Sequence, residues 1–189
     1  MRILLFGATG MVGQGVLRAC LTASDVDLVQ TVGRTATGIR DGKLREIIHP
    51  DLFDEAAMGD RLACFDACFF CLGVSSSEMN EEEYVRLTFD LTTSVAETLA
   101  KLNPAMTFVC VSGSGTDSSE KGPSMWARVK GRTENALLRM PFRQAYMFRP
   151  GLIVPLNGIQ SKVVSYFLLS IEAIAPRIAR SLPQSGAHN

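Results

Sequence analysis

The chain has 189 residues, of which 47% are hydrophobic and 20% charged, a length that suits one domain with a sizeable core. Its 19 basic and 19 acidic side chains cancel, which excludes the strongly basic surface of a general nucleic-acid binder. The mean hydropathy is +0.15, but no uninterrupted apolar run approaches the roughly 20 residues that cross a bilayer, so an integral membrane protein is not expected. Glycines at 7, 10 and 13 interrupt the apolar start too early for a signal peptide, and the sequence predicts a cytoplasmic protein.

The cysteines and histidines predict neither a disulfide framework nor a metal site. Five cysteines are an odd number, which argues against complete pairing. Cys68 and Cys71 fall in one predicted strand, where positions three apart face opposite sides of the sheet, so they cannot easily share an ion. We expect the cysteines to be small core residues in a reducing compartment. The only histidines are His49 and His188. This number is too small for a multi-histidine metal site, and it nearly excludes a histidine-based catalytic triad.

Strand-like apolar runs alternate with helical patterns along the chain. Strands are predicted at 2–6, 26–32, 44–48, 67–72, 107–112 and 144–148, and helices at 11–21, 53–62, 81–102 and 126–139. Continuous apolar strands separated by helices indicate a parallel sheet covered on both faces. The leading fold class is therefore α/β, a doubly wound parallel sheet (Rossmann fold) with three α/β/α layers.

We expect a dinucleotide-binding domain over residues 1–155 and a short helical extension of the same domain over 156–189, which leaves little material for a substrate lobe. The run at 163–175 is apolar at helical spacing. Packing on the sheet or on a partner subunit is the favoured interpretation of this run. Peripheral membrane contact is the less favoured alternative, because the run has few basic residues beside it.

The segment GATGMVG at 7–13 lies between the first strand and the first helix, the context that a dinucleotide-binding glycine turn requires. Gly7 permits the tight turn, Gly10 leaves room for a diphosphate beside the backbone, and Gly13 lets the helix pack closely on the sheet. The anion would be held at the amino end of the helix, by a turn that includes Thr9, Met11 and Val12. The alternative is a merely tight turn.

The end of the second strand predicts which dinucleotide binds. An NAD-selective site usually has Asp or Glu there, but this chain has Gly33-Arg34. A guanidinium suits a 2′-phosphate, so the sequence predicts that NADP(H) is preferred over NAD(H). The alternative is that Arg34 is a solvated loop charge.

Three further segments follow strands that end at the same edge of the predicted sheet. Asp51-Leu52 could meet the adenine, and Cys71-Leu72-Gly73 could let the cofactor pass closely; either segment could also be ordinary turn chemistry. The loop at 113–123 is rich in Gly and Ser and follows the fifth strand, where ligands bind in open α/β sheets. Its alternative is a flexible surface connection.

The chain resembles the short-chain dehydrogenase/reductase superfamily, in its atypical branch of NmrA-like and Tat-interacting-protein-like oxidoreductases, whose members are often described as nucleoside-diphosphate-sugar epimerase-like. The resemblance rests on GATGMVG at 7–13, GR at 33–34, FDACFFCLG at 65–73, FVCVSGSGTD at 108–117, WARVKGRTENAL at 126–137 and FRPG at 148–151. It implies a Rossmann fold with a bound NAD(P) cofactor that Pro150 of the last segment would adjoin.

The resemblance also implies a catalytic Ser after the fifth strand and a Tyr-x-x-x-Lys on the next helix, and here the chain departs from the family. Lys130 matches, but Trp126 occupies the tyrosine position, and indole has no proton to exchange near neutral pH. Ser112 is the favoured serine; its alternative is a strand-end serine bound to local backbone. Lys130 could still donate to ribose hydroxyls, or be a solvated helix charge. Trp126 could stack on nicotinamide or close the pocket, or only pack helices together.

Two functions follow as hypotheses. The first is an NADP-dependent oxidoreductase or epimerase-like enzyme acting on a small carbonyl compound or sugar nucleotide. The second is a catalytically silent NADPH-binding protein that acts through a protein partner. The helices at 81–102 and 126–139 occupy positions that resemble the family's dimer-forming helices, which makes a homodimer a further hypothesis.

Overall fold

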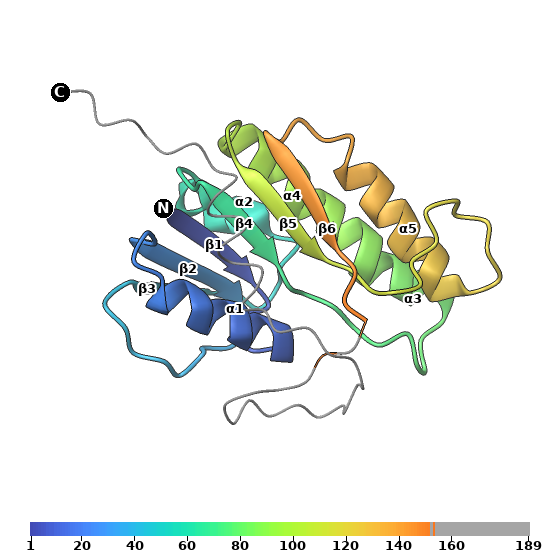
Figure 1. The fold of residues 1–189 in the computed structure, drawn as a ribbon, viewed down its shortest axis with the longest axis horizontal. Helices are drawn as coiled ribbons and strands as arrows, with labels where there is room; N and C mark the ends of the chain where they lie inside the picture. Colours follow the sequence, from blue (N-terminus) through green and yellow to red (C-terminus); the bar gives the residue numbers. More distant parts are fainter. Residues whose placement is uncertain (152, 154–189) are drawn as a thin grey trace.

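The computed structural model describes residues 1–151 and 153, and its centre is a six-stranded parallel sheet in the order β3-β2-β1-β4-β5-β6 (Figure 1). The strands are β1 (Arg2–Phe6), β2 (Leu28–Gly33), β3 (Leu44–Ile48), β4 (Ala67–Phe70), β5 (Thr107–Val111) and β6 (Gln144–Phe148). This order confirms the predicted doubly wound fold. Residues 152 and 154–189, and with them the whole predicted extension at 156–189 and its apolar run, lie outside the described residues.

Helices cover both faces of the sheet. They are α1 (Met11–Thr22), α2 (Glu55–Met58), the 3₁₀ turn η1 (Gly59–Leu62), α3 (Glu81–Val85), the π-helical turn η2 (Arg86–Asp90), α4 (Leu91–Leu102) and α5 (Met125–Leu137). On one face, Val16 and Leu17 of α1 pack in a cluster with Leu5 of β1. On the other face, Val95 and Leu99 of α4 pack in a second cluster, to which α2, η1 and α5 contribute. Together these layers give the predicted three-layer α/β/α arrangement.

The central strands are apolar because both of their faces are covered. All four residues of β4 are buried, and the rings of Phe6, Phe70 and Phe108 follow one another across β1, β4 and β5 at centroid distances of 5.4 and 6.0 Å. Cys68 belongs to the cluster on the α4 face, whereas Cys71 packs against the cluster on the α1 face. The prediction that these two thiols point to opposite sides is confirmed.

One cysteine departs from the prediction of a core role. Cys64 is exposed and has a positive φ of 64°, so it lies in a surface turn before β4 and not in the core. The other four thiols are buried or partly buried. Among the described residues, no group of three or more His, Cys, Asp or Glu side chains is placed to hold a metal ion.

The predicted strands at 2–6, 44–48 and 144–148 have the observed bounds, and the others differ by one or two residues at their ends. The predicted strand at 67–72 stops at Phe70, although the Cys71 amide still donates to the Phe6 carbonyl at 3.0 Å. Strand 107–112 stops at Val111, while the Ser112 amide donates to Phe148 at 2.7 Å. The strand predicted to start at 26 starts at Leu28, after a turn.

Two predicted helices are interrupted. The helix expected at 53–62 is a short α-helix followed by a 3₁₀ turn, because Gly59 takes a positive φ of 49° that ends α2. The helix expected at 81–102 begins with a capping box between Asn80 and Glu83 but contains the π-helical turn η2. Periodicity alone does not reveal a π turn, and such turns are frequent at functional sites.

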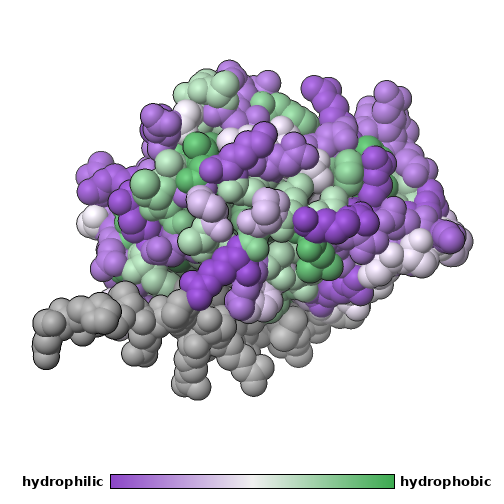
Figure 2. All heavy atoms as spheres, turned by 90° about the horizontal axis from the view of Figure 1, so that it is seen from above, coloured by the Kyte–Doolittle hydropathy of each residue, from purple (hydrophilic) through white to green (hydrophobic). Residues whose placement is uncertain are grey.

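The surface seen in Figure 2 mixes hydrophilic residues with smaller hydrophobic areas. The large hydrophobic side chains that are exposed come from separate segments: Ile39, Ile48, Val74, Leu87 and Leu138. No helix within the described residues is long and apolar enough to cross a membrane.

Candidate functional site

The strand order reverses between β1 and β4, and the carboxyl ends of these strands open the crevice in which ligands bind in such sheets. The glycine turn follows β1 directly, and Cys71-Leu72-Gly73 follows β4. The register pairs Phe6 with Phe70, so both segments leave the sheet side by side. Two of the predicted cofactor-binding segments therefore meet.

The three glycines of the turn are required for different reasons. Gly7 has a φ of +79°, and a Cβ there would lie 2.8 Å from the Cys71 carbonyl and the Leu72 nitrogen. A Cβ on Gly13 would lie 2.0 Å from the Gly7 carbonyl oxygen. A Cβ on Gly10, by contrast, would approach nothing closer than 3.4 Å. The fold itself needs Gly7 and Gly13, whereas the open space beside Gly10 is available to a ligand.

The amino end of α1 is suited to an anion. Gly10 is the N-cap residue and provides no side-chain cap, and the first turn holds no acidic residue. The first intrahelical bond runs from the Gln14 amide to the Gly10 carbonyl at 2.8 Å, so the amides of Met11, Val12 and Gly13 have no acceptor one turn earlier in the helix. A diphosphate fits these amides and the dipole of the helix. Thr9 is exposed beside them, and its carbonyl accepts from the Gln14 side chain at 2.9 Å.

The predicted adenine-side residues lie at the same edge of the sheet. Arg34 is exposed directly after β2. The Asp51 carboxylate accepts a hydrogen bond from the Phe53 amide at 2.9 Å, so it caps its own turn. Leu52 is only 7% exposed and belongs to the core cluster on the α4 face, so its side chain anchors the turn after β3, and its place beside the adenine stays a prediction.

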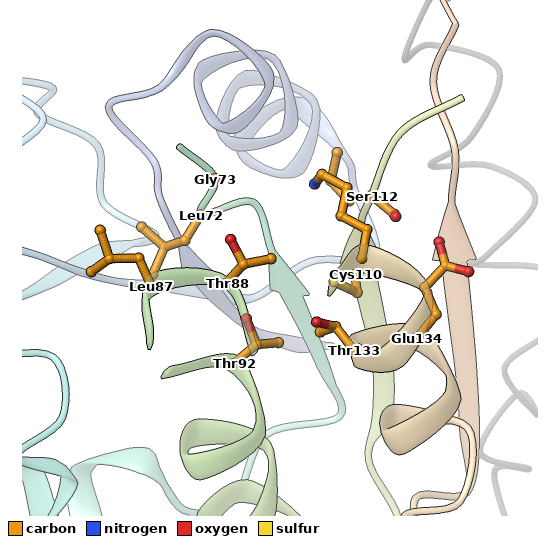
Figure 3. A pocket seen from close by; sticks show the side chains of 11 residues that line it. Leu72, Gly73, Leu87, Thr88, Thr92, Cys110, Ser112, Thr133 and Glu134 are labelled. Carbon is orange, nitrogen blue, oxygen red and sulfur yellow. The ribbon is translucent and has the colours of Figure 1, made fainter. Parts of the chain in front are cut away.

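A pocket opens beside this crevice, at the ends of β4 and β5 and between η2–α4 and α5 (Figure 3). Ser112 and Lys130 both line it, which brings the predicted catalytic pair together. Leu72 and Gly73 form part of its wall, together with Leu87 and Cys110. Its other polar residues were not predicted from the sequence: Thr88, Thr92, Thr133 and Glu134. Figure 3 shows the residues of η2 and α4 facing those of β5 and α5.

Lys130 is the only lysine in this pocket wall, and its environment disfavours the charged form. Burial lowers the pKa of its amine, while Cys110 and Glu134 oppose that shift. Burial also raises the pKa of the Cys110 thiol to about 12, with Lys130 acting in the other direction, so this thiol is protonated at neutral pH. Within the described residues no hydrogen bond engages the Lys130 ammonium, which leaves it available to a ligand.

Trp126 packs on the loop after β5 and is not part of the pocket wall. A Cβ on Gly115 would lie 3.2 Å from the indole Cη2 atom. A Cβ on Gly113 would lie 3.9 Å from both the indole Cζ3 atom and the Lys130 Cδ atom. Trp126 and Lys130 therefore reach the same loop from one face of α5, as the spacing of four predicts.

The Ser112 hydroxyl is bonded within its own loop. Its Oγ lies 3.0 Å from the Thr116 Oγ1, and the Thr116 hydroxyl donates to the Gly113 carbonyl at 2.7 Å. Because the Thr116 proton is already used, Ser112 donates to Thr116 in this arrangement. No local motif in the sequence predicts that Thr116 is the hydrogen-bond partner of Ser112.

The loop at 113–123 is ordered by Asp117. The carboxylate accepts from the Ser119 hydroxyl at 2.6 Å and from the amides of Ser119, Lys121 and Gly122 at 3.0, 3.0 and 2.6 Å. A Cβ on Gly131 would lie 1.8 Å from the Asp117 carbonyl oxygen, so α5 packs closely against the loop. Of the two interpretations offered above, the hydrogen bonding disfavours a flexible connection.

We expect Asp117→Asn to lower the melting temperature at neutral pH by a few degrees, because an amide nitrogen cannot accept the loop's hydrogen bonds. The Ser119 hydroxyl and the loop amides lower the Asp117 pKa, so the stability they contribute is present above the unfolded pKa of about 3.9 and is lost as the pH falls through the lower folded pKa. Thermal denaturation at pH 7 and at about pH 3 measures this difference. It should shrink at the acidic pH, and exposed Asp60→Asn should show no such pattern; a pH-independent difference would contradict the assignment.

The comparisons with known sequences agree with this geometry. A model of the "NAD dependent epimerase/dehydratase family" matches residues 3–125, more than half of the chain. The mitochondrial protein FMP52 of Meyerozyma guilliermondii is 24% identical over 183 residues, which cover 96% of this chain and 76% of that protein. Protein HTATIP2 of Rattus norvegicus is 24% identical over 155 residues, which cover 80% of this chain and 62% of that protein.

Solved structures share the fold. MoeE5 in complex with UDP-glucuronic acid and NAD has a TM-score of 0.63 at 22% identity, over 79% of this chain and 54% of that one. UDP-glucuronic acid 4-epimerase from Bacillus cereus, in complex with NAD, has a TM-score of 0.62 at 17% identity, over 80% of this chain and 57% of that one. The chain thus spans little more than half the length of these structures.

The sequence relatives correct one prediction. We predicted a cytoplasmic protein, but the matched fungal proteins from several species are named mitochondrial, and the prediction of a cytoplasmic location is not supported. The fold, the glycine turn and the family match agree with the predicted nicotinamide-dinucleotide cofactor. The chain belongs to the NAD-dependent epimerase/dehydratase family.

Proposed function

We propose that the protein is an NADP(H)-dependent oxidoreductase or epimerase-like enzyme acting on a small carbonyl compound or a sugar nucleotide. The observation that carries the proposal is that Ser112 and Lys130 line one pocket beside the glycine turn. The fold neighbours that hold NAD together with UDP-glucuronic acid or UDP-glucose support a sugar-nucleotide class of substrate.

Each group has a distinct task in this proposal. The amino end of α1 holds the diphosphate, and the Lys130 ammonium donates to the ribose that carries the nicotinamide. The bound nicotinamide would supply or accept a hydride. At the end of β4, Gly73 offers a stretch of wall without a side chain, and Leu72 adds an apolar one. Because the indole of Trp126 is a hydrogen-bond donor only and does not act as an acid or a base near neutral pH, Ser112, Lys130 or an ordered water would exchange the substrate proton.

A second function is favoured by Trp126. The indole packs against Gly113 and Gly115, the position from which the family's phenol would act, and it supplies hydrophobic contact without acid–base chemistry. A protein that binds NADPH and acts through a protein partner would need the cofactor site but not the phenol. We keep this catalytically silent NADPH-binding protein as the alternative.

Turnover distinguishes the two functions. The purified protein is assayed for NADPH oxidation with a panel of carbonyl compounds and for conversion of UDP-sugars with each dinucleotide. If the protein is an enzyme, Lys130→Ala should lower turnover by at least about a hundredfold, while exposed Lys101→Ala in α4 should leave it unchanged. Tight NADPH binding with no turnover on either panel would favour the silent protein.

We expect Arg34→Ala to weaken NADPH binding about tenfold, or about 1.4 kcal/mol, because it removes the guanidinium that would meet the 2′-phosphate. NADH has no 2′-phosphate, so its binding should change little. Exposed Arg40→Ala is the matched control. Calorimetric titration with NADPH, NADP, NADH and NAD measures all four affinities. Equal affinities for NAD and NADP that Arg34→Ala leaves unchanged would remove the proposed preference.

A further inference from the structure

An ion pair between a buried carboxylate and an exposed guanidinium lies one helical turn beyond Lys130. Glu134 lines the same pocket, and its side chain is only 4% exposed. Both of its carboxylate oxygens accept from the Arg149 Nε, at 3.1 and 3.0 Å, and one also accepts from a terminal guanidinium nitrogen at 2.5 Å. Arg149 follows β6 directly, and the same guanidinium donates to the Ser118 hydroxyl. The pair therefore joins α5 to the segment after β6 and to the loop after β5.

Lys130 and Arg149 both lie where they could pair with the Glu134 carboxylate, and it is Arg149 that does so. Lys130 and Glu134 are four residues apart on α5, a spacing that places both side chains on the same face of the helix and within reach of each other. Yet the salt bridges among the described residues include Arg149–Glu134 and none between Lys130 and Glu134. Arg149 binds the carboxylate with two nitrogens, which a lysine cannot do. The carboxylate is thereby turned to Arg149, and the Lys130 ammonium stays free.

We propose that Arg149 is a positioning residue that holds the Glu134 carboxylate away from Lys130 and so keeps the Lys130 ammonium available to the ligand in the pocket. The identity of that ligand, the dinucleotide ribose or the substrate, rests on the proposed function. The proposal explains why a carboxylate can lie in the wall of a pocket whose ligand-binding cation is Lys130. The negative charge of Glu134 is neutralised by Arg149 and not by Lys130.

The other groups that face Lys130 do not replace Glu134 in this role. The η2–α4 side presents Thr88 and Thr92, which do not titrate; β5 presents the Cys110 thiol, and Ser112 follows directly after this strand. Burial keeps that thiol protonated at neutral pH, since it raises the pKa to about 12. Within the described pocket wall, Glu134 is thus the carboxylate whose pairing decides the electrostatic environment of Lys130.

Two single substitutions should move the Lys130 amine in opposite directions. In Arg149→Gln, the released carboxylate pairs with Lys130 and raises the pKa of its amine by at least about one unit. In Glu134→Gln, the amine loses a nearby negative charge and its pKa falls. The double variant carries neither charge, and its Lys130 pKa should return toward the wild-type value. Arg149→Lys keeps the positive charge but loses the contact through two nitrogens, so its Lys130 pKa should lie between those of the wild type and of Arg149→Gln.

Competitive labelling with trace acetic anhydride, read at Lys130 by peptide mass spectrometry over a range of pH, measures these values without any cofactor. Lys43 and Lys121 in the same digest are internal controls. A purely structural role of the ion pair would lower the melting temperature of both single variants and leave the midpoints unchanged. The loss of charge alone would displace the two midpoints in opposite directions but would leave the midpoint of Arg149→Lys at the wild-type value. Unchanged midpoints, midpoints displaced in the same direction, or a wild-type midpoint in Arg149→Lys would overturn the proposal.

NADPH affinity, measured on the same variants, tests the proposed function separately. If Lys130 binds the cofactor, Arg149→Gln should weaken binding about tenfold, and adding Glu134→Gln should restore most of it. Opposite labelling midpoints with unchanged NADPH affinity would support the role of Arg149 and remove Lys130 from the cofactor site. If Arg149→Gln does not fold, the opposed directions are tested with Arg149→Lys and Glu134→Gln.

Discussion

Gly10→Ala should give a protein that folds normally but binds NADPH at least about tenfold more weakly, or about 1.4 kcal/mol. A Cβ at this position meets only the Gly7 carbonyl, at 3.4 Å, which is an acceptable contact inside the protein. The same Cβ would occupy the open space at the amino end of α1, where the diphosphate would lie against the helical amides. Calorimetric titration and a melting curve of the same sample measure the two quantities.

Gly13→Ala is the matched comparison, and we expect the opposite order of effects. Its Cβ would lie 2.0 Å from the Gly7 carbonyl oxygen and 2.9 Å from the Ala8 Cα, so α1 would have to move away from the sheet, at a cost of about 1–3 kcal/mol or more. Its melting temperature should fall clearly, and its cofactor binding should fall with it. If Gly10→Ala binds NADPH as tightly as the wild type, the diphosphate does not lie at this turn.

The contrast between these two glycines shows where sequence analysis reached its limit. The spacing GATGMVG predicted a turn, and the apolar runs at 2–6, 44–48 and 144–148 predicted strands at the observed residues. These features are local, because a buried parallel strand and a glycine turn each need their residue types within a few positions. The sequence alone could not separate the glycines that the fold requires from Gly10, whose space is open to a ligand. That distinction depends on distances across the turn.

The pocket was the less predictable part, because its residues come from distant segments. Lys130 and Ser112 are implied by the resemblance to the short-chain dehydrogenase/reductase family, but Thr88 and Thr92 are ordinary threonines of a helical pattern until the sheet order places them opposite β5. Leu87 and Thr88 belong to a π-helical turn, but the apolar pattern of 81–102 is that of one continuous helix and does not reveal the turn. The Glu134–Arg149 pair joins residues fifteen positions apart, and no local motif predicts it.

Trp126→Tyr should create or raise NADPH-dependent carbonyl reduction by at least about a hundredfold, the lower end of what a positioned acid–base group contributes. Position 126 and Lys130 face the loop after β5 from the same side of α5, so a phenol there would lie beside an ammonium that lowers its pKa. Ser112, at the start of the same loop, would face the substrate oxygen. NADPH oxidation on the panel of carbonyl compounds, at saturating cofactor, measures the gain.

Two further variants determine whether the phenol is the cause. Trp126→Phe removes the indole and leaves a ring of the same shape as that of tyrosine but without the hydroxyl, so its turnover should not rise above that of the wild type. Adding Lys130→Met to Trp126→Tyr removes the neighbouring ammonium and should abolish the gain. An equal gain in Trp126→Phe would attribute the effect to a wider pocket. If Trp126→Tyr binds NADPH and stays inert on every substrate, the missing phenol is not what separates this chain from an active enzyme, and the account of Trp126 as the lost acid–base position is wrong.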